Sequence, residues 1–195
     1  MTSSSLSQLI LASGSPRRRQ LLAAAGLRFE VIESAVEERR RAGELAAEYA
    51  ARMARDKAIA VAGRFPAAFV LGADTVVECL GEILEKPLGA DDARRMLTML
   101  SGRTHTVVTA YAIARAARIM AAEAVESRVT FRALGHHEIT RYIAGGEPFD
   151  KAGGYGIQGA GGGFIAAVAG ARDNVMGLPV ENVLAALRRV GFGGC

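Results

Sequence analysis

Short apolar runs alternate along this chain with longer stretches in which apolar residues recur at helical spacing. The runs "LILA" and "AFVLGADTVV" are apolar and partly β-branched, which is typical of buried strands. The stretch 43–63 is rich in Ala, Glu and Arg and has the pattern of an amphipathic helix. Because such strands and helices interleave, the pattern predicts an α/β or α+β domain built on a mixed β-sheet.

The same pattern gives bounds for the individual elements. Strands are expected at residues 9–12, 29–34, 68–80, 104–115, 118–132 and 164–168, with a hairpin turn at Gly81-Glu82. Helices are expected at residues 16–25, 43–63, 90–100, 137–145 and 178–190. Ser15 is the expected N-cap of the first helix, and Asp91 or Asp92 that of the third.

Composition narrows the class of protein. The 195 residues suit one domain, residues 1–195, and half of them are hydrophobic, which predicts a globular chain. The net charge of +4 comes without a long basic tail and with few aromatics, so a nucleic-acid surface is not expected and a small anionic ligand is. The apolar runs are too short and too often interrupted by charge to span a membrane.

Targeting and redox signals are also sparse. The N-terminal "MTSSSLSQ" has no basic segment followed by an apolar one, so no export signal is expected. Two cysteines, Cys79 and Cys195, do not make a disulfide framework. A cytoplasmic protein is therefore the expectation.

The stretch "SGSPRRR" is the first candidate for chemistry. A strand ends there and a helix begins, and the free N–H groups at a helix start favour an anion. Ser13 and Ser15 add hydroxyl groups, and Arg17 and Arg18 add guanidinium forks that match phosphate oxygens. Arg19 points elsewhere on the helix and is expected to be solvated.

Carboxylates provide a second group of candidates. Asp74 is expected at or near the end of a buried strand, where a carboxylate needs a cation, a metal ion or helix-end donors. A hairpin would bring Asp74 beside Glu85 and Lys86. Together with Glu37 and Glu38, such acids could provide two or three ligands to Mg²⁺. Nearby cations are expected to lower the pKa of Asp74.

Three lysines and a glycine-rich passage are the remaining candidates for the functional site. Only Lys57, Lys86 and Lys151 are lysines among 24 basic residues, which suggests that each is kept where arginine would not serve. The passage 153–163 allows a ligand to approach the backbone closely, and Gln158 within it could read a base edge. Residues 155–158 are expected to be extended. The chain shows no Walker loop, zinc-ligand cluster or nucleophile elbow.

These motifs together resemble the Maf family of nucleoside triphosphate pyrophosphatases. The motifs "LASGSPRRRQLL", "LGADTVV", "EKP", "SGRTHTVVTA", "DKAGGYGIQG" and "NVMGLPV" follow in the family's order over nearly the whole chain. The resemblance implies an α/β fold with a mixed central β-sheet flanked by helices, in two lobes around a cleft. It also implies a divalent metal cofactor, Mg²⁺ or Mn²⁺, and suggests a homodimer, which is common in such enzymes.

Within the family, "DKAGGYGIQG" is similar to the branch that hydrolyses dTTP and UTP to the monophosphate and pyrophosphate. The resemblance makes Asp74 the proton acceptor and gives base selection to Arg17, Thr75 and Gln158. It places the other candidates around the phosphates and the metal: Ser13, Arg18, Glu38, Lys57, Lys86 and Lys151. Of these, Glu38 and Asp74 are the expected metal ligands, and Glu38, Lys57 and Lys86 are counted with Asp74 as catalytic.

The expected reaction is in-line attack of water on the α-phosphorus, with house-cleaning of the nucleotide pool as its purpose. Two alternatives stay open at this point. One is a pyrophosphatase for 7-methyl-GTP or another purine nucleotide. The other is a nucleotide-binding regulator of cell division that does not hydrolyse its ligand.

Overall fold

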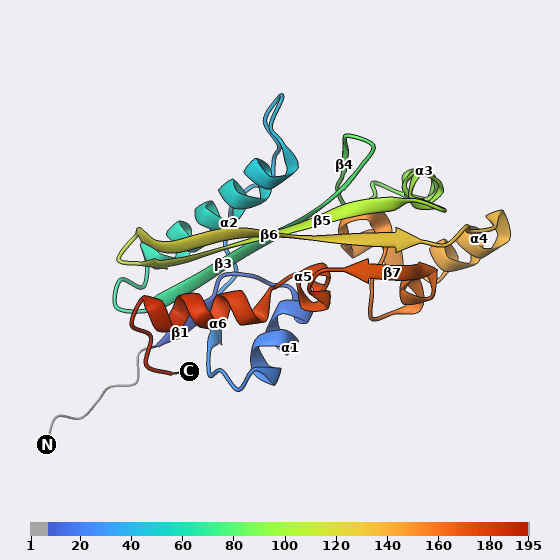
Figure 1. The fold of residues 1–195 in the computed structure, drawn as a ribbon. Coiled ribbons are helices and arrows are strands. Elements are labelled where there is room, and N and C mark those ends of the chain that lie inside the picture. The colour runs from blue at the N-terminus through green and yellow to red at the C-terminus, as the bar shows by residue number, and fades with distance from the viewer. Residues whose placement is uncertain (1–7, 195) are drawn as a thin grey trace, which may run out of the picture. The chain divides into compact units, whose positions relative to one another are not determined.

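The computed structural model describes residues 8–194, and its strands form one mixed seven-stranded sheet within that range (Figure 1). The strand order is β2-β1-β3-β5-β6-β7, with β4 paired to β3. β1 is parallel to β2 and to β3, whereas β4 runs antiparallel to β3 and β7 antiparallel to β6. The predicted mixed central sheet flanked by helices is confirmed.

Contacts along the described chain define two compact units. The first comprises residues 8–74, 109–124 and 177–194, and the second comprises residues 75–108 and 125–176. Three strands contribute residues to both units: β3 (Phe69–Cys79), β5 (Thr104–Arg115) and β6 (Arg118–Phe131).

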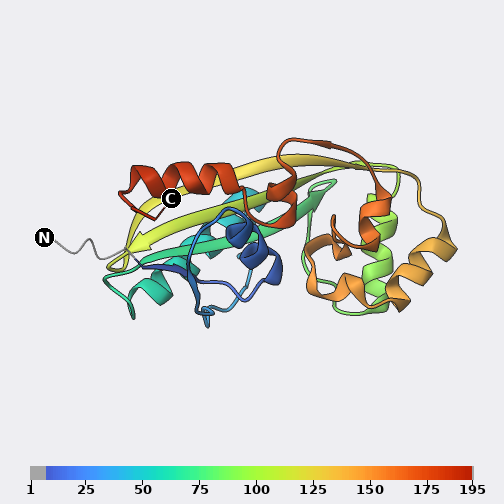
Figure 2. The same cartoon turned by 90° about the horizontal axis from the view of Figure 1, so that it is seen from below.

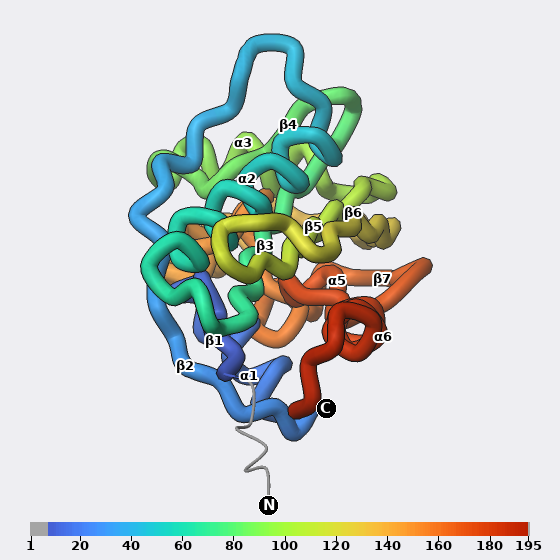
Figure 3. Tube along the Cα trace, turned by 90° about the vertical axis from the view of Figure 1, so that its left-hand side faces the viewer, coloured from blue at the N-terminus to red at the C-terminus, as the bar shows by residue number. Residues whose placement is uncertain are grey.

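The first unit places helices on both faces of its strands. Besides its parts of the long strands it contains β1 (Leu9–Leu11), α1 (Pro16–Ala24), β2 (Glu30–Val31), α2 (Ala46–Ala62) and α6 (Val180–Arg189). Figure 3 looks at these strands end-on and shows α2 on one side of β3 and α6 on the other.

The core of the first unit explains this layering. Successive side chains of a strand point to opposite faces of the sheet. The odd-numbered residues of β1 and β3 share one face and pack with Leu22 of α1 and Leu187 of α6. The even-numbered face of β3 meets α2 at Gly72, where an added Cβ would lie 2.3 Å from the Ala54 carbonyl oxygen. Glycine is required there because the helix backbone touches the strand.

The second unit is built on the far halves of the long strands. It adds β4 (Glu82–Leu84), α3 (Ala90–Leu100), α4 (His136–Ala144), β7 (Ile165–Ala169) and α5 (Arg172–Met176). Three 3₁₀ turns, η1 (Glu147–Asp150), η2 (Ala152–Gly154) and η3 (Ala160–Phe164), connect α4 to β7. Figure 2 shows α3 and α4 side by side in this unit. Its core contains Leu97 from α3, Phe131 from β6 and Ile143 from α4.

The predicted elements exist, and most of the differences lie at their ends. The strand expected at 29–34 is reduced to β2, and the helix expected from residue 43 begins at Ala46. Gly89, and neither Asp91 nor Asp92, is the N-cap of α3, although both acids lie in its first turn. Residues 155–158 form no strand, because the passage continues in short turns that bury Tyr155 and Ile157.

Two further expectations concern membranes and the termini. No helix within residues 8–194 combines the length and apolarity that a bilayer crossing needs. Cys79 is a buried free thiol, while Cys195 and most of the N-terminal "MTSSSLSQ" lie outside the described residues.

Candidate active site

Asp74 lies in the middle of β3, and the prediction that it lies at or near the end of a buried strand is wrong. The strand stays buried beyond it at Val76, Val77 and Cys79, because the apolar pattern continues into the hairpin with β4. Since Phe69, Leu71 and Ala73 face the core of the first unit, alternation turns Asp74 to the opposite face, toward α2. Its side chain is only 11% exposed.

Lys57 of α2 is the partner of this carboxylate. Its Nζ donates to Oδ1 of Asp74 at 2.7 Å, and the lysine side chain is 6% exposed. The contact depends on Gly72, Ala54 and Ala58, which are small enough to bring helix and strand together. A compact ammonium on a flexible stem suits this narrow space better than a guanidinium would.

Glu38 meets the same ammonium from the irregular segment that precedes α2. Its Oε1 lies 2.6 Å from Nζ of Lys57, while its side chain remains 43% exposed. Lys57 therefore joins two carboxylates, one buried in the sheet and one open to solvent. The structure brings together Glu38, Lys57 and Asp74, as the sequence motifs indicated.

The pKa of Asp74 differs from the sequence-based expectation. Burial raises it above the ordinary value of an aspartate, and the positive charges of Lys57 and Arg18 oppose this rise without cancelling it. The expected lowering of this pKa was wrong because the loss of hydration outweighs the nearby cations. A raised pKa makes the carboxylate a better proton acceptor.

The start of α1 provides hydroxyl and guanidinium groups to the same unit. Ser15 is the N-cap, as predicted, and its Oγ accepts a hydrogen bond from the Arg18 amide. Arg18 is buried: its Nε donates to the Gly177 carbonyl at 2.8 Å, and its NH1 donates to Oγ of Ser13 at 3.0 Å. Arg17 is half-buried, whereas Arg19 is exposed, as expected.

Arg18 consequently has a structural role that the sequence did not indicate. Its guanidinium ties the start of α1 to Gly177, at the far end of the chain. Its charge also acts on Asp74 and Glu38. A buried arginine of this kind orders the helix start against which an anion would bind.

The remaining candidates belong to the second unit. Thr75 is half-buried in β3, Lys86 is exposed beyond β4, and Gln158 is exposed between Ile157 and Gly159. Lys151 is half-buried, with its Nζ donating to the Glu147 carbonyl at 2.7 Å and pairing with Asp150.

The glycine-rich passage that carries Lys151 and Gln158 packs onto the β3–β4 hairpin. The Gly153 amide donates to the Glu85 carbonyl at 3.1 Å, next to Lys86. An added Cβ at Gly153 would lie 3.0 Å from the side chain of Val77 in β3. The hairpin and the passage thus place the four candidates of this unit on neighbouring segments.

Glu147 is a residue of this region that sequence reasoning missed. Its carboxylate accepts hydrogen bonds from the Tyr142 hydroxyl at 3.0 Å, from the Ala160 amide at 2.8 Å and from the Gly161 amide at 3.2 Å. Glu147 therefore joins the two ends of the loop 147–161, on which Gln158 lies. Only the tertiary contact distinguishes this glutamate from the other surface acids.

Known proteins resemble this chain over most of its length. The family described as "Maf-like protein" matches residues 8–190. A dTTP/UTP pyrophosphatase of Myxococcus xanthus is 50% identical over 184 residues, covering 94% of this chain and 93% of the relative. A second dTTP/UTP pyrophosphatase, from Anaeromyxobacter dehalogenans, is 49% identical over 188 residues, 95% of each chain.

Among solved structures, a HAM1 protein from Coxiella burnetii aligns with a TM-score of 0.41 at 14% identity, over 64% of this chain and 73% of that one. A score at this level does not establish a common fold. The match over residues 8–190 and the identity to both relatives do establish the family. The chain belongs to the Maf family.

Proposed function

We propose that this protein hydrolyses dTTP and UTP to the nucleoside monophosphate and pyrophosphate, a house-cleaning reaction of the nucleotide pool. The observation that carries the proposal is the convergence of Asp74 and Glu38 on Lys57, at 2.7 and 2.6 Å. The substrate comes from the two relatives of about half-identical sequence, both named dTTP/UTP pyrophosphatases. The alignment spans nearly the whole of each chain.

In the proposed reaction, Asp74 orients the attacking water and accepts its proton. Its burial raises its pKa, which supports a role as base, and Lys57 holds the carboxylate in place. The triphosphate would lie at the start of α1, where the positive end of the helix, Ser13 and Arg17 favour an anion. Arg18 keeps that helix start in position through Gly177.

The second unit contributes the remaining roles. Lys86 and Lys151 would neutralise phosphate charge, since a lysine ammonium can reach a single oxygen. Thr75 and Gln158, together with Arg17, would select the base. The exposed amide of Gln158 offers both a donor and an acceptor, the combination that a pyrimidine edge requires.

The donor set fits a divalent cation that is shared with the substrate. Glu38 and Asp74 offer carboxylate oxygens, the ligands that Mg²⁺ and Mn²⁺ prefer. Within residues 8–194, no group of three or more His, Cys, Asp or Glu side chains is placed to hold a metal ion. The remaining ligands would therefore be phosphate oxygens and water. Such a cation, when bound, would neutralise charge on the triphosphate and on the departing pyrophosphate.

A nucleotide panel tests the proposal. Purified protein is incubated with Mg²⁺ or Mn²⁺ and dTTP, UTP, dCTP, dATP, GTP, 7-methyl-GTP or inosine triphosphate, and pyrophosphate release is measured. We expect dTTP and UTP to be the preferred substrates. Preference for a purine nucleotide would reject the substrate assignment, and binding of dTTP without pyrophosphate release would reject the enzyme.

A further inference from the structure

The segment between β2 and α2, residues 32–45, has no regular secondary structure and carries Glu38. Its backbone hydrogen bonds are scattered: the Ile32 amide donates to the Leu11 carbonyl, the Arg39 amide to the Glu37 carbonyl at 3.2 Å, and the Glu44 amide to the Arg41 carbonyl at 3.2 Å. The side chain of Glu38 is partly open to solvent. The contact of Glu38 with Lys57 therefore depends on how this irregular backbone is held.

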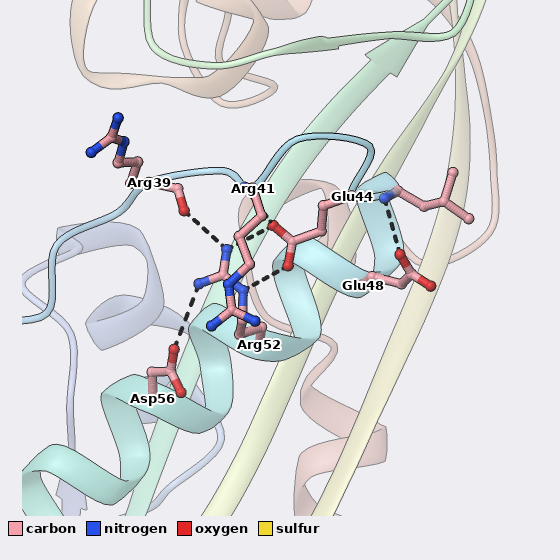
Figure 4. Close-up of polar contacts among 7 residues, drawn as sticks. Arg39, Arg41, Glu44, Glu48, Arg52 and Asp56 are labelled. Atoms are coloured by element: carbon pink, nitrogen blue, oxygen red, sulfur yellow. Dashed lines mark hydrogen bonds and ion pairs between the residues drawn. The ribbon is translucent and has the colours of Figure 1, made fainter.

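Arg52 of α2 is the residue that holds this segment (Figure 4). Its Nε and NH2 donate to the two carboxylate oxygens of Glu44, at 2.6 and 2.7 Å. The same NH2 donates to the Arg39 carbonyl at 2.9 Å. Asp56, one turn further along α2, lies 3.7 Å from NH1 and steadies the guanidinium on its other side.

These contacts lie next to the proposed active site. Arg39 directly follows Glu38, so its carbonyl is fixed one residue from the catalytic carboxylate. Arg52 and Lys57 belong to the same helix, which therefore provides both the anchor of the segment and the cation that Glu38 meets.

We propose that Arg52, paired with Glu44, is a positioning residue that sets the Glu38 carboxylate against Lys57. The inference rests on the proposed function, because it assigns Arg52 to the same reaction. It adds a residue that touches neither the substrate nor the reacting atoms.

Burial and chemistry favour a positioning role over an ordinary surface ion pair. The side chains of Glu44 and Arg52 are 9% and 17% exposed, so neighbouring residues cover most of this ion pair. Hydrogen bonding from Arg52 lowers the pKa of Glu44 to about 2, which keeps the carboxylate charged. The guanidinium donates to both carboxylate oxygens of Glu44 and to the Arg39 carbonyl. A lysine ammonium lacks the planar fork that makes this bidentate contact.

Arg52→Lys and Glu44→Gln test the positioning role, and Arg55→Lys is the matched control. Arg55 is exposed on the same helix, and the proposal gives it no role. We expect kcat/KM for dTTP to fall on the order of 10-fold to 100-fold in the first two variants, since small misplacements of a reacting group have effects of that size. Arg55→Lys is expected to match the wild type, and equal effects of Arg52→Lys and Arg55→Lys would overturn the proposal.

A double-mutant cycle separates positioning from general stability. If Arg52 acts through Glu38, Arg52→Lys causes no further loss of activity in a Glu38→Gln background. Losses that multiply, or a Glu38→Gln enzyme as active as the wild type, would show that Arg52 does not act through Glu38.

Amide hydrogen exchange provides a test that does not depend on activity. Exchange in residues 37–45 is expected to accelerate in Arg52→Lys and Glu44→Gln and to stay unchanged in Arg55→Lys. Unchanged exchange in all three variants would overturn the proposal even in an active enzyme. An inactive wild type with accelerated exchange in the two variants would instead reject the proposed function and leave Arg52 as the anchor of the segment.

Discussion

At the scale of single residues, the proposed active site depends on Asp74, a carboxylate buried in the middle of a strand and paired with one lysine. Replacement by asparagine keeps the shape and removes the proton-accepting group. We expect Asp74→Asn to lower kcat on the order of 100-fold to 10,000-fold, the usual contribution of a general base. Pyrophosphate release measures the loss, and circular dichroism checks that the variant is folded. Turnover near that of the wild type in a folded variant would remove Asp74 from the mechanism.

His105 gives a residue-scale prediction about pH. It is buried in the second unit, its Nε2 is 2.7 Å from the Tyr155 hydroxyl, and its Nδ1 is buried without a hydrogen-bond partner. Burial lowers its pKa from 6.5 to about 4, so the folded protein favours the neutral ring. The unfolded chain therefore binds a proton first as the pH falls. Stability due to His105 is complete above pH 6.5 and is lost as the pH falls from there through about 4.

Urea unfolding between pH 8 and pH 4 measures this effect. The free energy of unfolding of the wild type should fall by up to about 1.4 kcal/mol per pH unit because of His105 alone. His105→Phe removes the titrating ring, so its stability should depend less steeply on pH, although Tyr155 loses a hydrogen-bond partner at every pH. Parallel pH profiles for the two proteins would show that His105 does not titrate in this range.

The residues also show where sequence reasoning succeeds and where it cannot. The motifs led to Asp74, Lys57 and Glu38 because each lies in a short pattern with a chemical reason. Arg18 was assigned to phosphate, but its contact with Gly177 joins positions far apart in the chain. Nothing in the sequence distinguishes Glu147 from an ordinary surface acid, and its bond with the Ala160 amide is seen only in the fold. Partners of this kind are set by tertiary structure and leave no local pattern.

At the scale of elements, the existence and type of most helices and strands followed from periodicity, whereas their ends and the short helix α5 did not. β2 is short because only Glu30 and Val31 pair with β1. α2 begins at Ala46, where the Leu45 amide donates to the Glu48 carboxylate at 3.1 Å. Glycine density at 153–163 predicted a close approach of the backbone, which Gly153 makes against Val77. The predicted extended run at 155–158 forms no strand, although the backbone of Tyr155 itself is extended.

The β5–β6 hairpin offers an element-scale prediction about stability. Its turn residues Ala116 and Ala117 both have positive φ, 48° and 58°, a conformation that disfavours a residue with a Cβ. Asparagine and glycine adopt it readily in two-residue hairpins. We expect the double substitution Ala116→Asn, Ala117→Gly to stabilise the protein by about 1 kcal/mol and to raise Tm by about 2–4 °C.

Thermal unfolding with a matched glycine control tests this expectation. Ala35 is exposed in an irregular segment and has no positive φ, so Ala35→Gly should lower Tm or leave it unchanged. A hairpin variant that is no more stable than the wild type would show that the turn carries little strain.

The Glu147 loop gives a second element-scale prediction. Glu147→Gln replaces one accepting oxygen by an NH₂ group, which cannot accept a hydrogen bond, so a bond from Ala160, Gly161 or Tyr142 is lost. Amide exchange at Ala160 and Gly161 should accelerate several-fold. The control is Glu126→Gln, an exposed acid of β6, which should leave both amides unchanged. Equal exchange in the two variants would contradict the proposed closure of the loop.

At the scale of the whole molecule, the candidate residues divide between the two units. Ser13, Arg17, Arg18, Glu38, Lys57 and Asp74 belong to the first, and Thr75, Lys86, Lys151 and Gln158 to the second. The motifs single out these residues as candidates, since each motif is local. They could not predict this division, because Asp74 and Thr75 are neighbours in β3 and yet fall on either side of the boundary.

The last prediction concerns how the whole protein responds to its ligands. With only Glu38 and Asp74 as carboxylates at Lys57, and with no larger cluster of metal-binding side chains in residues 8–194, Mg²⁺ alone should bind weakly. A nucleotide would supply the missing oxygen ligands. A ligand that binds only the folded protein stabilises it by about 2.7 kcal/mol at 100 times its Kd. We therefore expect millimolar Mg²⁺ to leave Tm nearly unchanged, and Mg²⁺ with a non-hydrolysable dTTP analogue to raise it by several degrees.

A variant at Glu38 separates a shared metal site from simple nucleotide binding. In Glu38→Gln the metal-dependent part of the Tm shift should shrink, because one of the proposed ligands is lost, while the shift caused by the analogue in EDTA should persist through Arg17 and the start of α1. Glu126→Gln, which changes an exposed acid of β6, is the control and should behave as the wild type. A large Tm shift with Mg²⁺ alone would show that the protein holds the cation without the nucleotide. An analogue shift equally large with and without Mg²⁺ would show that no cation is shared between them.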